Sequence, residues 1–186
     1  MMHRPFPASY WVVDGLLLAG EYAGAVSAPR ARRKLEALLD AGIRAFFDLT
    51  EEGELAPYAD MLTELAGERH VAVAYDRVPI PDLGVPSTAD LHTLLSRLEA
   101  NVSGGTPSFV HCWGGIGRTG TVIGCWLVQH DALDGQQALE RITDLRRGTA
   151  DDRRRSPETD EQAALVLGWA EVRTNTFGQV SGDHGR

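Results

Sequence analysis

The sequence predicts an α/β fold, with a central, mostly parallel sheet flanked by helices in a single domain. Short apolar runs typical of strands alternate along the chain with longer stretches whose apolar residues follow helical spacing. The 186 residues, 43% of them hydrophobic, suffice to fill the core of one domain, and no repeat, linker or low-complexity block divides them. We place this domain at 8–173 and expect residues 174–186 to form a polar C-terminal tail.

The first half of the chain predicts a hairpin followed by helices that alternate with strands. The hairpin joins 11–13 to 16–18 through Asp14-Gly15, a two-residue turn signal. The elements expected next are a helix from Ser27 to about Leu39 that Gly42 ends, a strand at 43–49, a short helix at 54–66 that Pro57 weakens, and a strand at 71–75.

The second half predicts helices with clear start signals. Ser87 with Asp90, and Asp134 with Gln137, have the spacing of residues that cap a helix N-terminus. The expected elements are a helix from Ser87 with a leucine stripe, a strand at 106–110, a helix at 119–130, a helix from Asp134 to about Arg146, and a last helix from Ser156 to about Arg173.

The most informative stretch is 111–119, which reads HCWGGIGRT. It lies between a predicted strand and a predicted helix, at the carboxyl end of a strand, where open α/β sheets bind ligands. Unpaired backbone N–H groups converge at such a turn, and the helix dipole adds partial positive charge. Its glycines let the backbone approach an anion without Cβ clashes. The stretch therefore predicts an anion site.

Cys112 and Arg118 stand at the two ends of this turn. A thiol attacks as the thiolate, whose formation is favoured at helix N-termini and beside arginine, and Cys112 would experience both influences. The planar fork of Arg118 can hold two phosphate oxygens at once. Together these residues predict a sulfur nucleophile facing a phosphoryl group, and the alternative is an inert, buried cysteine in a glycine turn.

The pattern of His-Cys, five residues and Arg-Thr resembles the signature of the cysteine-dependent protein tyrosine phosphatase superfamily. The small size of the chain, and the lack of a Trp before the acid loop, make it most similar to the compact dual-specificity branch. Three further segments resemble parts of that family: 78–82 the general-acid loop, 156–162 the segment with a water-positioning glutamine, and 10–24 the N-terminal hairpin of small members.

The resemblance implies a protein tyrosine phosphatase-like fold and hydrolysis of phosphomonoesters through a cysteinyl-phosphate intermediate. Cys112 would attack phosphorus, and Asp82 would protonate the leaving oxygen and then activate water. Asp76 is the second choice for that acid, and the alternative for Asp82 is a plain turn aspartate after proline. The groups expected to bind the phosphate are the Arg118 side chain and the backbone N–H groups of Trp113, Gly114, Gly115, Ile116, Gly117 and Arg118.

Three residues have supporting roles in the same scheme. Thr119 would donate its hydroxyl to the departing thiolate, with an ordinary helix-start threonine as the alternative. Gln162 would align the hydrolytic water, with a solvent-facing glutamine as the alternative. His111 would hold the loop through hydrogen bonds and help to keep the thiol acidic without touching substrate, with a core histidine that has no catalytic role as the alternative.

Composition limits the partners. Eighteen Lys and Arg against 26 Asp and Glu give a net charge of −8, which argues against general nucleic-acid binding. Two cysteines make no disulfide framework, no signal peptide is visible, and the apolar run at 122–128 is too short to span a bilayer. We expect a cytoplasmic monomer without membrane partners, metal or organic cofactor.

The expected substrate is a phosphorylated protein or a small phosphate ester. Phosphoinositide-directed relatives commonly carry lysines in the loop, and residues 113–117 contain none. Phosphoinositides and other non-protein esters are the alternative substrates, and a non-catalytic phospho-ligand-binding module is the alternative function. A sulfurtransferase is less favoured because rhodanese-type loops lack this His and Thr pairing. An arsenate reductase is less favoured because small reductases place the cysteine near the N-terminus. The run Arg153–Arg155 could edge the pocket, or it could pair with Asp151 and Asp152 as a solvated loop.

Overall fold

The computed structural model describes residues 3–178, with side chains to residue 172. Its strands are β1 (Ser9–Val13), β2 (Leu17–Gly20), β3 (Ala45–Asp48), β4 (Ala74–Arg77) and β5 (Ser108–His111). Its helices are α1 (Ala28–Asp40), α2 (Ala59–Glu68), α3 (Thr88–Ser103), α4 (Gly117–His130), α5 (Gly135–Leu145) and α6 (Asp160–Gly178).

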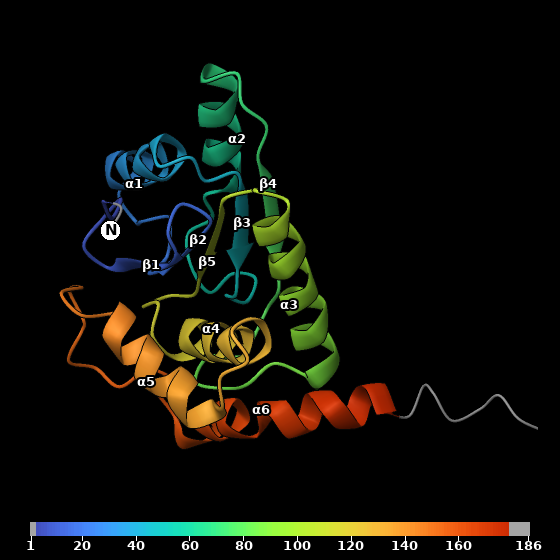
Figure 1. Ribbon diagram of the computed structural model, residues 1–186. Coiled ribbons are helices and arrows are strands. Elements are labelled where there is room, and N and C mark those ends of the chain that lie inside the picture. Colours follow the sequence, from blue (N-terminus) through green and yellow to red (C-terminus); the bar gives the residue numbers. More distant parts are fainter. Residues whose placement is uncertain (1–2, 179–186) are drawn as a thin grey trace, which may run out of the picture.

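The five strands form one sheet in the order β1-β2-β5-β3-β4 (Figure 1). β1 pairs antiparallel with β2, whereas the pairs β2–β5, β5–β3 and β3–β4 are parallel. The predicted α/β fold with a mostly parallel sheet is therefore confirmed. β5 lies at the centre, so the loop that follows it opens at the middle of the sheet edge.

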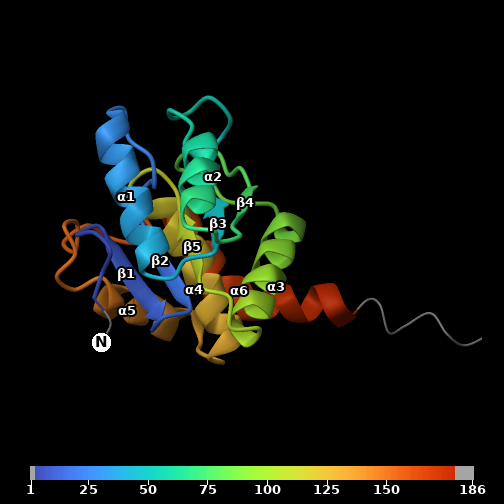
Figure 2. The same cartoon turned by 90° about the horizontal axis from the view of Figure 1, so that it is seen from above.

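Side chains alternate along each strand between two cores, as a period of two requires. One core lies between the sheet and helices α1 and α2, and it contains Trp11, Leu18, Phe46 and Phe109. The other lies under α3, α4, α5 and α6, and it contains Tyr10, Leu17, Phe47 and Val110 (Figure 2). α4 is buried from Gly117 to Val128, which fixes the loop before it against the sheet. Among the described residues, no helix is both long and apolar enough to cross a membrane.

The predicted helix starts agree with the structure at two positions. Ser87 Oγ accepts the N–H of Asp90 at 3.1 Å. Asp134 and Gln137 form a reciprocal capping box at the start of α5. Ser27 occupies the N-cap of α1, but its side chain makes no capping hydrogen bond, and proline enters the first turn instead.

Several predicted boundaries were wrong, each for a local reason. The hairpin turn has three residues, because Val13 pairs with Leu17. α2 begins at Ala59 rather than 54, since proline at position 57 disfavours helix in the residue before it. His70 adopts a φ of 53° and the N–H of Val71 bonds Ala66 O at 3.0 Å, so residues 70–71 end α2 and β4 starts only at Ala74.

The last helix also differs from its prediction. Its N-terminus is capped by Thr159, whose Oγ1 accepts the N–H of Gln162 at 3.2 Å, so α6 begins at Asp160 rather than at Ser156. α6 continues to Gly178, past the predicted domain end at 173 and into the predicted tail. Residues 179–186 of that tail lie outside the described residues.

Candidate active site

The loop between β5 and α4, residues 112–116, presents a row of free backbone donors. None of the N–H groups of residues 113–119 has an acceptor among the described residues. They belong to the loop and to the first turn of α4, where helical N–H groups have no intrahelical partner. Such converging N–H groups, together with the helix dipole, favour an anion over the loop.

The loop is held in place by its carbonyl groups. Trp113 O accepts the N–H of Tyr22 at 2.8 Å, and Ile116 O accepts the Ser156 hydroxyl at 2.7 Å. Gly115 has a φ of +68°, and a Cβ on it would lie 2.3 Å from the carbonyl carbon of Gly20. Glycine is therefore needed here both for its conformation and for the close approach of β2.

A cavity of about 390 Å³ opens over this loop and brings together residues from distant parts of the sequence. Its lining is Asp82, Leu83, Cys112, Trp113, Gly114, Ile116, Gly117, Arg118, Arg154, Glu158 and Gln162. The predicted nucleophile, arginine, acid and glutamine thus face one space. Asp76 does not line this cavity and instead pairs with Arg97, so of the two aspartates considered for the acid only Asp82 lies at the cavity.

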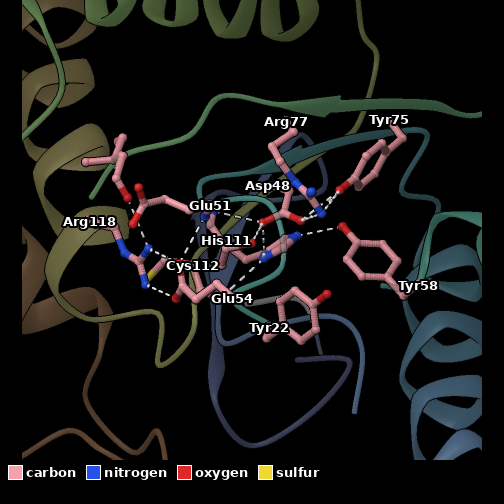
Figure 3. A network of polar contacts seen from close by, with 12 residues as sticks. Tyr22, Asp48, Glu51, Glu54, Tyr58, Tyr75, Arg77, His111, Cys112 and Arg118 are labelled. Atoms are coloured by element: carbon pink, nitrogen blue, oxygen red, sulfur yellow. Dashed lines mark hydrogen bonds and ion pairs between the residues drawn. The ribbon is translucent and has the colours of Figure 1, made fainter. Parts of the chain in front are cut away.

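Arg118 is the buried cation of the site, with a side chain only 2% exposed. Its Nη1 and Nη2 atoms donate to the two carboxylate oxygens of Glu54 at 2.7 and 2.6 Å (Figure 3). Nη1 also donates to Ile80 O at 3.1 Å, and Nη2 lies 3.1 Å from Asp82 Oδ1. The guanidinium is therefore oriented by its outer nitrogens before any phosphate arrives.

Glu54 is not among the site residues that the sequence predicts, because the sequence predicts a helix at 54–66. Since α2 starts only at Ala59, Glu54 lies in the loop after β3 and reaches Arg118. The carboxylate also accepts the N–H of Glu51 at 2.9 Å (Figure 3). The hydrogen bonds from Arg118 hold the pKa of Glu54 below its usual value. Pro57 was the available signal, since it argues against a helix that begins before it.

The loop that carries Asp82 is attached at both ends. Val78 and Ile80 donate their N–H groups to Asp48 O and Leu49 O, which extends the β3–β4 pairing beyond the strands. Gly84 N–H bonds Pro81 O at 2.9 Å, and Leu83 adopts a φ of 60°. This tight turn exposes Asp82, whose side chain is 54% accessible, at the mouth of the cavity.

Gln162 is buried, which excludes the solvent-facing alternative. Its Oε1 accepts the N–H groups of Glu158 and Thr159 at 3.1 and 3.2 Å. Its Nε2 donates to Gly84 O at 2.9 Å, so the side chain ties the start of α6 to the Asp82 loop. One Nε2 hydrogen remains for a group inside the cavity.

Thr119 has a fully buried side chain whose hydroxyl finds no hydrogen-bond partner among the described residues. It lies in the first turn of α4, directly after Arg118. Most buried hydroxyls are hydrogen-bonded, so an unpaired one beside a candidate site needs an explanation. One explanation is that the hydroxyl gains its hydrogen-bond acceptor only during a reaction, when a neighbouring group binds or becomes charged.

His111 joins the loop to a buried polar network. Its Nε2 lies 2.6 Å from Tyr58 Oη and its Nδ1 lies 3.3 Å from Cys112 O (Figure 3). Burial lowers the pKa of His111 to about 4, although Asp48 nearby opposes this. The ring is therefore neutral at pH 7, and any effect on the thiol passes through hydrogen bonds and not through its charge.

Asp48 completes this network at the end of β3. Its carboxylate accepts hydrogen bonds from the N–H and hydroxyl of Thr50 at 2.9 and 2.7 Å, and from Tyr75 at 2.8 Å. Burial alone would raise the pKa of Asp48, but the His111 ring and these hydrogen bonds lower it. The network holds His111, the last residue of β5, directly before the loop begins at Cys112.

The arginine run 153–155 supports the pocket-edge interpretation at one residue, and within the described residues it forms no ion pair with Asp151 or Asp152. Arg154 lines the cavity and pairs with Glu158 at 2.6 Å, whereas Arg155 pairs with Asp160 at 2.5 Å on the solvent side. Buried Arg146 holds the segment by donating to Asp151 O and Arg154 O. One residue of the run thus edges the site.

The sequence and fold of this chain are similar to those of known phosphatase-related proteins. Cyclin-dependent kinase inhibitor 3 of the pig, Sus scrofa, is 31% identical over 117 residues, which cover 62% of this chain and 54% of that protein. The match thus spans about half the length of that curated relative. A mutant form of Tk-PTP has a TM-score of 0.70 at 28% identity, covering 91% of this chain and 98% of that one.

A third similarity concerns the fold alone. PTPMT1 in complex with PI(5)P has a TM-score of 0.66 at 20% identity, covering 90% of this chain and 98% of that one.

The family model described as "PTP-SAK: Swiss Army Knife protein, DSP-PTPase phosphatase domain" matches residues 8–166. The strand–loop–helix site and this match over most of the sequence lead to one conclusion: the chain belongs to the PTP-SAK family, a compact, dual-specificity-like branch of the cysteine-dependent protein tyrosine phosphatases.

Proposed function

We propose that this protein is a phosphomonoester hydrolase that acts through a cysteinyl-phosphate intermediate, with phosphorylated proteins as its substrates. The observation that supports this most strongly is the shared cavity of Cys112 and Arg118, over backbone N–H groups that have no acceptor within the described structure. A phosphoryl group there would satisfy donors that the protein leaves unpaired.

In the first step the Cys112 thiolate attacks phosphorus, and an S–P bond forms as the bond to the leaving oxygen breaks. Asp82 gives its proton to that oxygen, so the departing alcohol or phenol leaves neutral. The N–H groups of 113–118 and the Arg118 guanidinium hold the three equatorial oxygens, where charge accumulates in the transition state.

In the second step water breaks the S–P bond. Asp82, now a carboxylate, takes a proton from the water as its oxygen attacks phosphorus, and inorganic phosphate is released. The leaving group is the Cys112 thiolate, and the unpaired hydroxyl of Thr119 is the donor assigned to stabilise it. The free Nε2 hydrogen of Gln162 would orient the water.

Substrate binding requires an exchange at Arg118. The guanidinium contacts Asp82 at 3.1 Å, on the cavity side, and Glu54 at 2.6 and 2.7 Å. A phosphate that binds Arg118 would replace Asp82 there, while Glu54 keeps hold of Nη1 and Nη2. The displaced Asp82, which is exposed to solvent, can then take up a proton from water and face the leaving oxygen as the acid.

Phosphorylated protein is the favoured substrate for two reasons. The family description is that of a dual-specificity phosphatase domain, and the loop residues 113–117 contain no lysine that would pair with the extra phosphates of an inositol headgroup. The mouth of the cavity instead presents an aromatic ring, Trp113, which is 61% exposed. An exposed indole ring can pack against apolar side chains of a peptide that carries the phosphorylated residue.

The test measures phosphate release from phosphotyrosine, phosphoserine and phosphothreonine peptides, from inositol phosphates and from p-nitrophenyl phosphate. Cys112→Ser should abolish turnover and retain binding of phosphate or tungstate, because the N–H groups and Arg118 remain. Cys125→Ala is the matched control, since Cys125 is the buried second cysteine and does not line the cavity. Binding of phosphopeptides without any phosphate release by the wild type would instead show a phospho-ligand-binding module.

A further inference from the structure

A second hollow of about 430 Å³ lies beside the catalytic cavity. Trp113 lines both spaces, so the two are adjacent. The other residues that matter at the second hollow are Tyr22, Val26, Arg30, Lys34 and Leu55. The proposed reaction makes no use of them.

The position of the hollow relative to the cavity is fixed by hydrogen bonds. Tyr22 donates its N–H to Trp113 O at 2.8 Å and its hydroxyl to Ala56 O at 2.8 Å. The segment that supplies Leu55 to the hollow supplies Glu54 to Arg118. A ligand that reaches from one space to the other therefore meets a surface whose parts are tied together.

The hollow combines apolar surface with a free cation. Val26 is fully exposed at 101%, and Trp113 is 61% exposed, although large apolar side chains elsewhere are mostly buried. Lys34 is occupied by Glu21 at 3.0 Å and by Tyr22 O. Arg30, in contrast, is exposed and forms no ion pair with any described residue. In a chain with a net charge of −8, an unpaired cation beside exposed apolar surface favours an acidic, amphipathic ligand.

We propose that this hollow binds the peptide segment that flanks the phosphorylated residue of a protein substrate. A large apolar side chain of that segment would pack on Val26, Leu55 and Trp113, and an acidic side chain would pair with Arg30. This inference rests on the proposed function, and it adds a sequence preference that the phosphate-binding loop alone cannot supply.

The experiment compares phosphotyrosine peptides that share one scaffold. One set carries leucine and glutamate within about three residues of the phosphotyrosine, a reach of about 10 Å in extended chain, on either side. The reference set carries alanine and glutamine at the same positions. kcat/KM should be about tenfold higher for the best leucine and glutamate peptide, while kcat/KM for p-nitrophenyl phosphate gives the baseline.

Substitution of two exposed residues tests whether the hollow is the surface that binds the flanking peptide. Val26→Ser should remove the preference for leucine, and Arg30→Gln should remove the preference for glutamate, each without changing turnover of p-nitrophenyl phosphate. Leu167→Ser and Arg33→Gln are matched controls: Leu167 is 50% exposed, Arg33 lies on the same helix as Arg30, and neither lines the hollow. Both controls should keep the preferences of the wild type.

The outcomes separate the inference from the proposed function. Failure to release phosphate from any phosphopeptide would overturn the proposed function. Release that is equal for both peptide sets, or preferences that survive Val26→Ser and Arg30→Gln, would overturn only the inference. Preferential hydrolysis of phosphatidylinositol phosphate vesicles that Val26→Ser weakens would assign the hollow to an acyl chain and would also overturn it.

Discussion

Glu54 holds both terminal nitrogens of Arg118, at 2.7 and 2.6 Å, although 64 residues separate them in sequence. The pair is charge-assisted and bidentate, with the arginine side chain 2% exposed and that of the glutamate 17% exposed. Nε of Arg118 makes no hydrogen bond to any described residue, and Nη2 faces Asp82. Glu54 therefore orients the fork so that one edge is left for phosphate.

Glu54→Gln should lower kcat/KM for p-nitrophenyl phosphate by about tenfold, because an amide presents an NH2 group to one guanidinium nitrogen and the fork loses its orientation. The loss should fall mainly on kcat, since removal of a competing negative charge favours phosphate binding. Steady-state kinetics measure both constants. Glu52→Gln, an exposed substitution on the same loop, should leave them unchanged, and an equal effect of the two variants would contradict a positioning role for Glu54.

Asp82→Ala should lower kcat by about 10²-fold or more with little change in KM, because proton delivery acts in the transition state and not in binding. The loss should be larger for a phosphoserine peptide than for p-nitrophenyl phosphate, whose leaving group departs without a proton. The dependence of kcat on leaving-group acidity measures this directly. Asp76→Asn is the matched control, since Asp76 pairs with Arg97 outside the cavity. Equal losses on both substrates would remove Asp82 from the role of acid.

Local signals account for the parts of the site that the sequence predicts. The strand before Cys112, the glycine turn and the helix after Arg118 are contiguous, so residue type and spacing suffice to place them. The capping pairs at Ser87 and Asp134 are local in the same way. A parallel sheet then brings the ends of β3, β4 and β5 to one edge, which places Asp82 near Cys112.

Long-range contacts explain what the sequence did not reveal. Glu54 binds Arg118 only because α2 starts after Pro57, and the pairing itself leaves no local pattern. The tether from Gln162 to Gly84 spans 78 residues, so sequence analysis could assign Gln162 to a helix but not to the Asp82 loop. The neutral state of His111 depends on burial between Tyr58 and Asp48, which periodicity does not report.

Gly115→Ala should destabilise the protein by about 2 kcal/mol or more, because a Cβ would meet the carbonyl carbon of Gly20 at 2.3 Å and the φ of +68° is unfavourable for alanine. Gly105→Ala separates the two causes, since Gly105 has a φ of +70° but no atom within 4 Å of the added Cβ. It should lose only about 1 kcal/mol. Urea unfolding of both variants measures the difference, and equal losses would mean that the contact with Gly20 is unimportant.

His111 should make the free energy of unfolding depend on pH. Its pKa is about 4 in the folded protein, below the usual 6.5, so the unfolded state binds more protons between these values. Stability that is fully present above pH 6.5 should fall by up to about 3 kcal/mol as the pH drops to 4. Asp48, whose pKa is lowered from 3.8, contributes its own loss only at lower pH.

His111→Asn should be less stable at pH 7 but should lack the pH dependence that comes from His111, since asparagine does not titrate. Urea unfolding at pH 7, 6, 5 and 4 measures the free energy of unfolding of both proteins. If this free energy fell equally with pH in the two proteins, protonation of His111 would not be the cause of the loss.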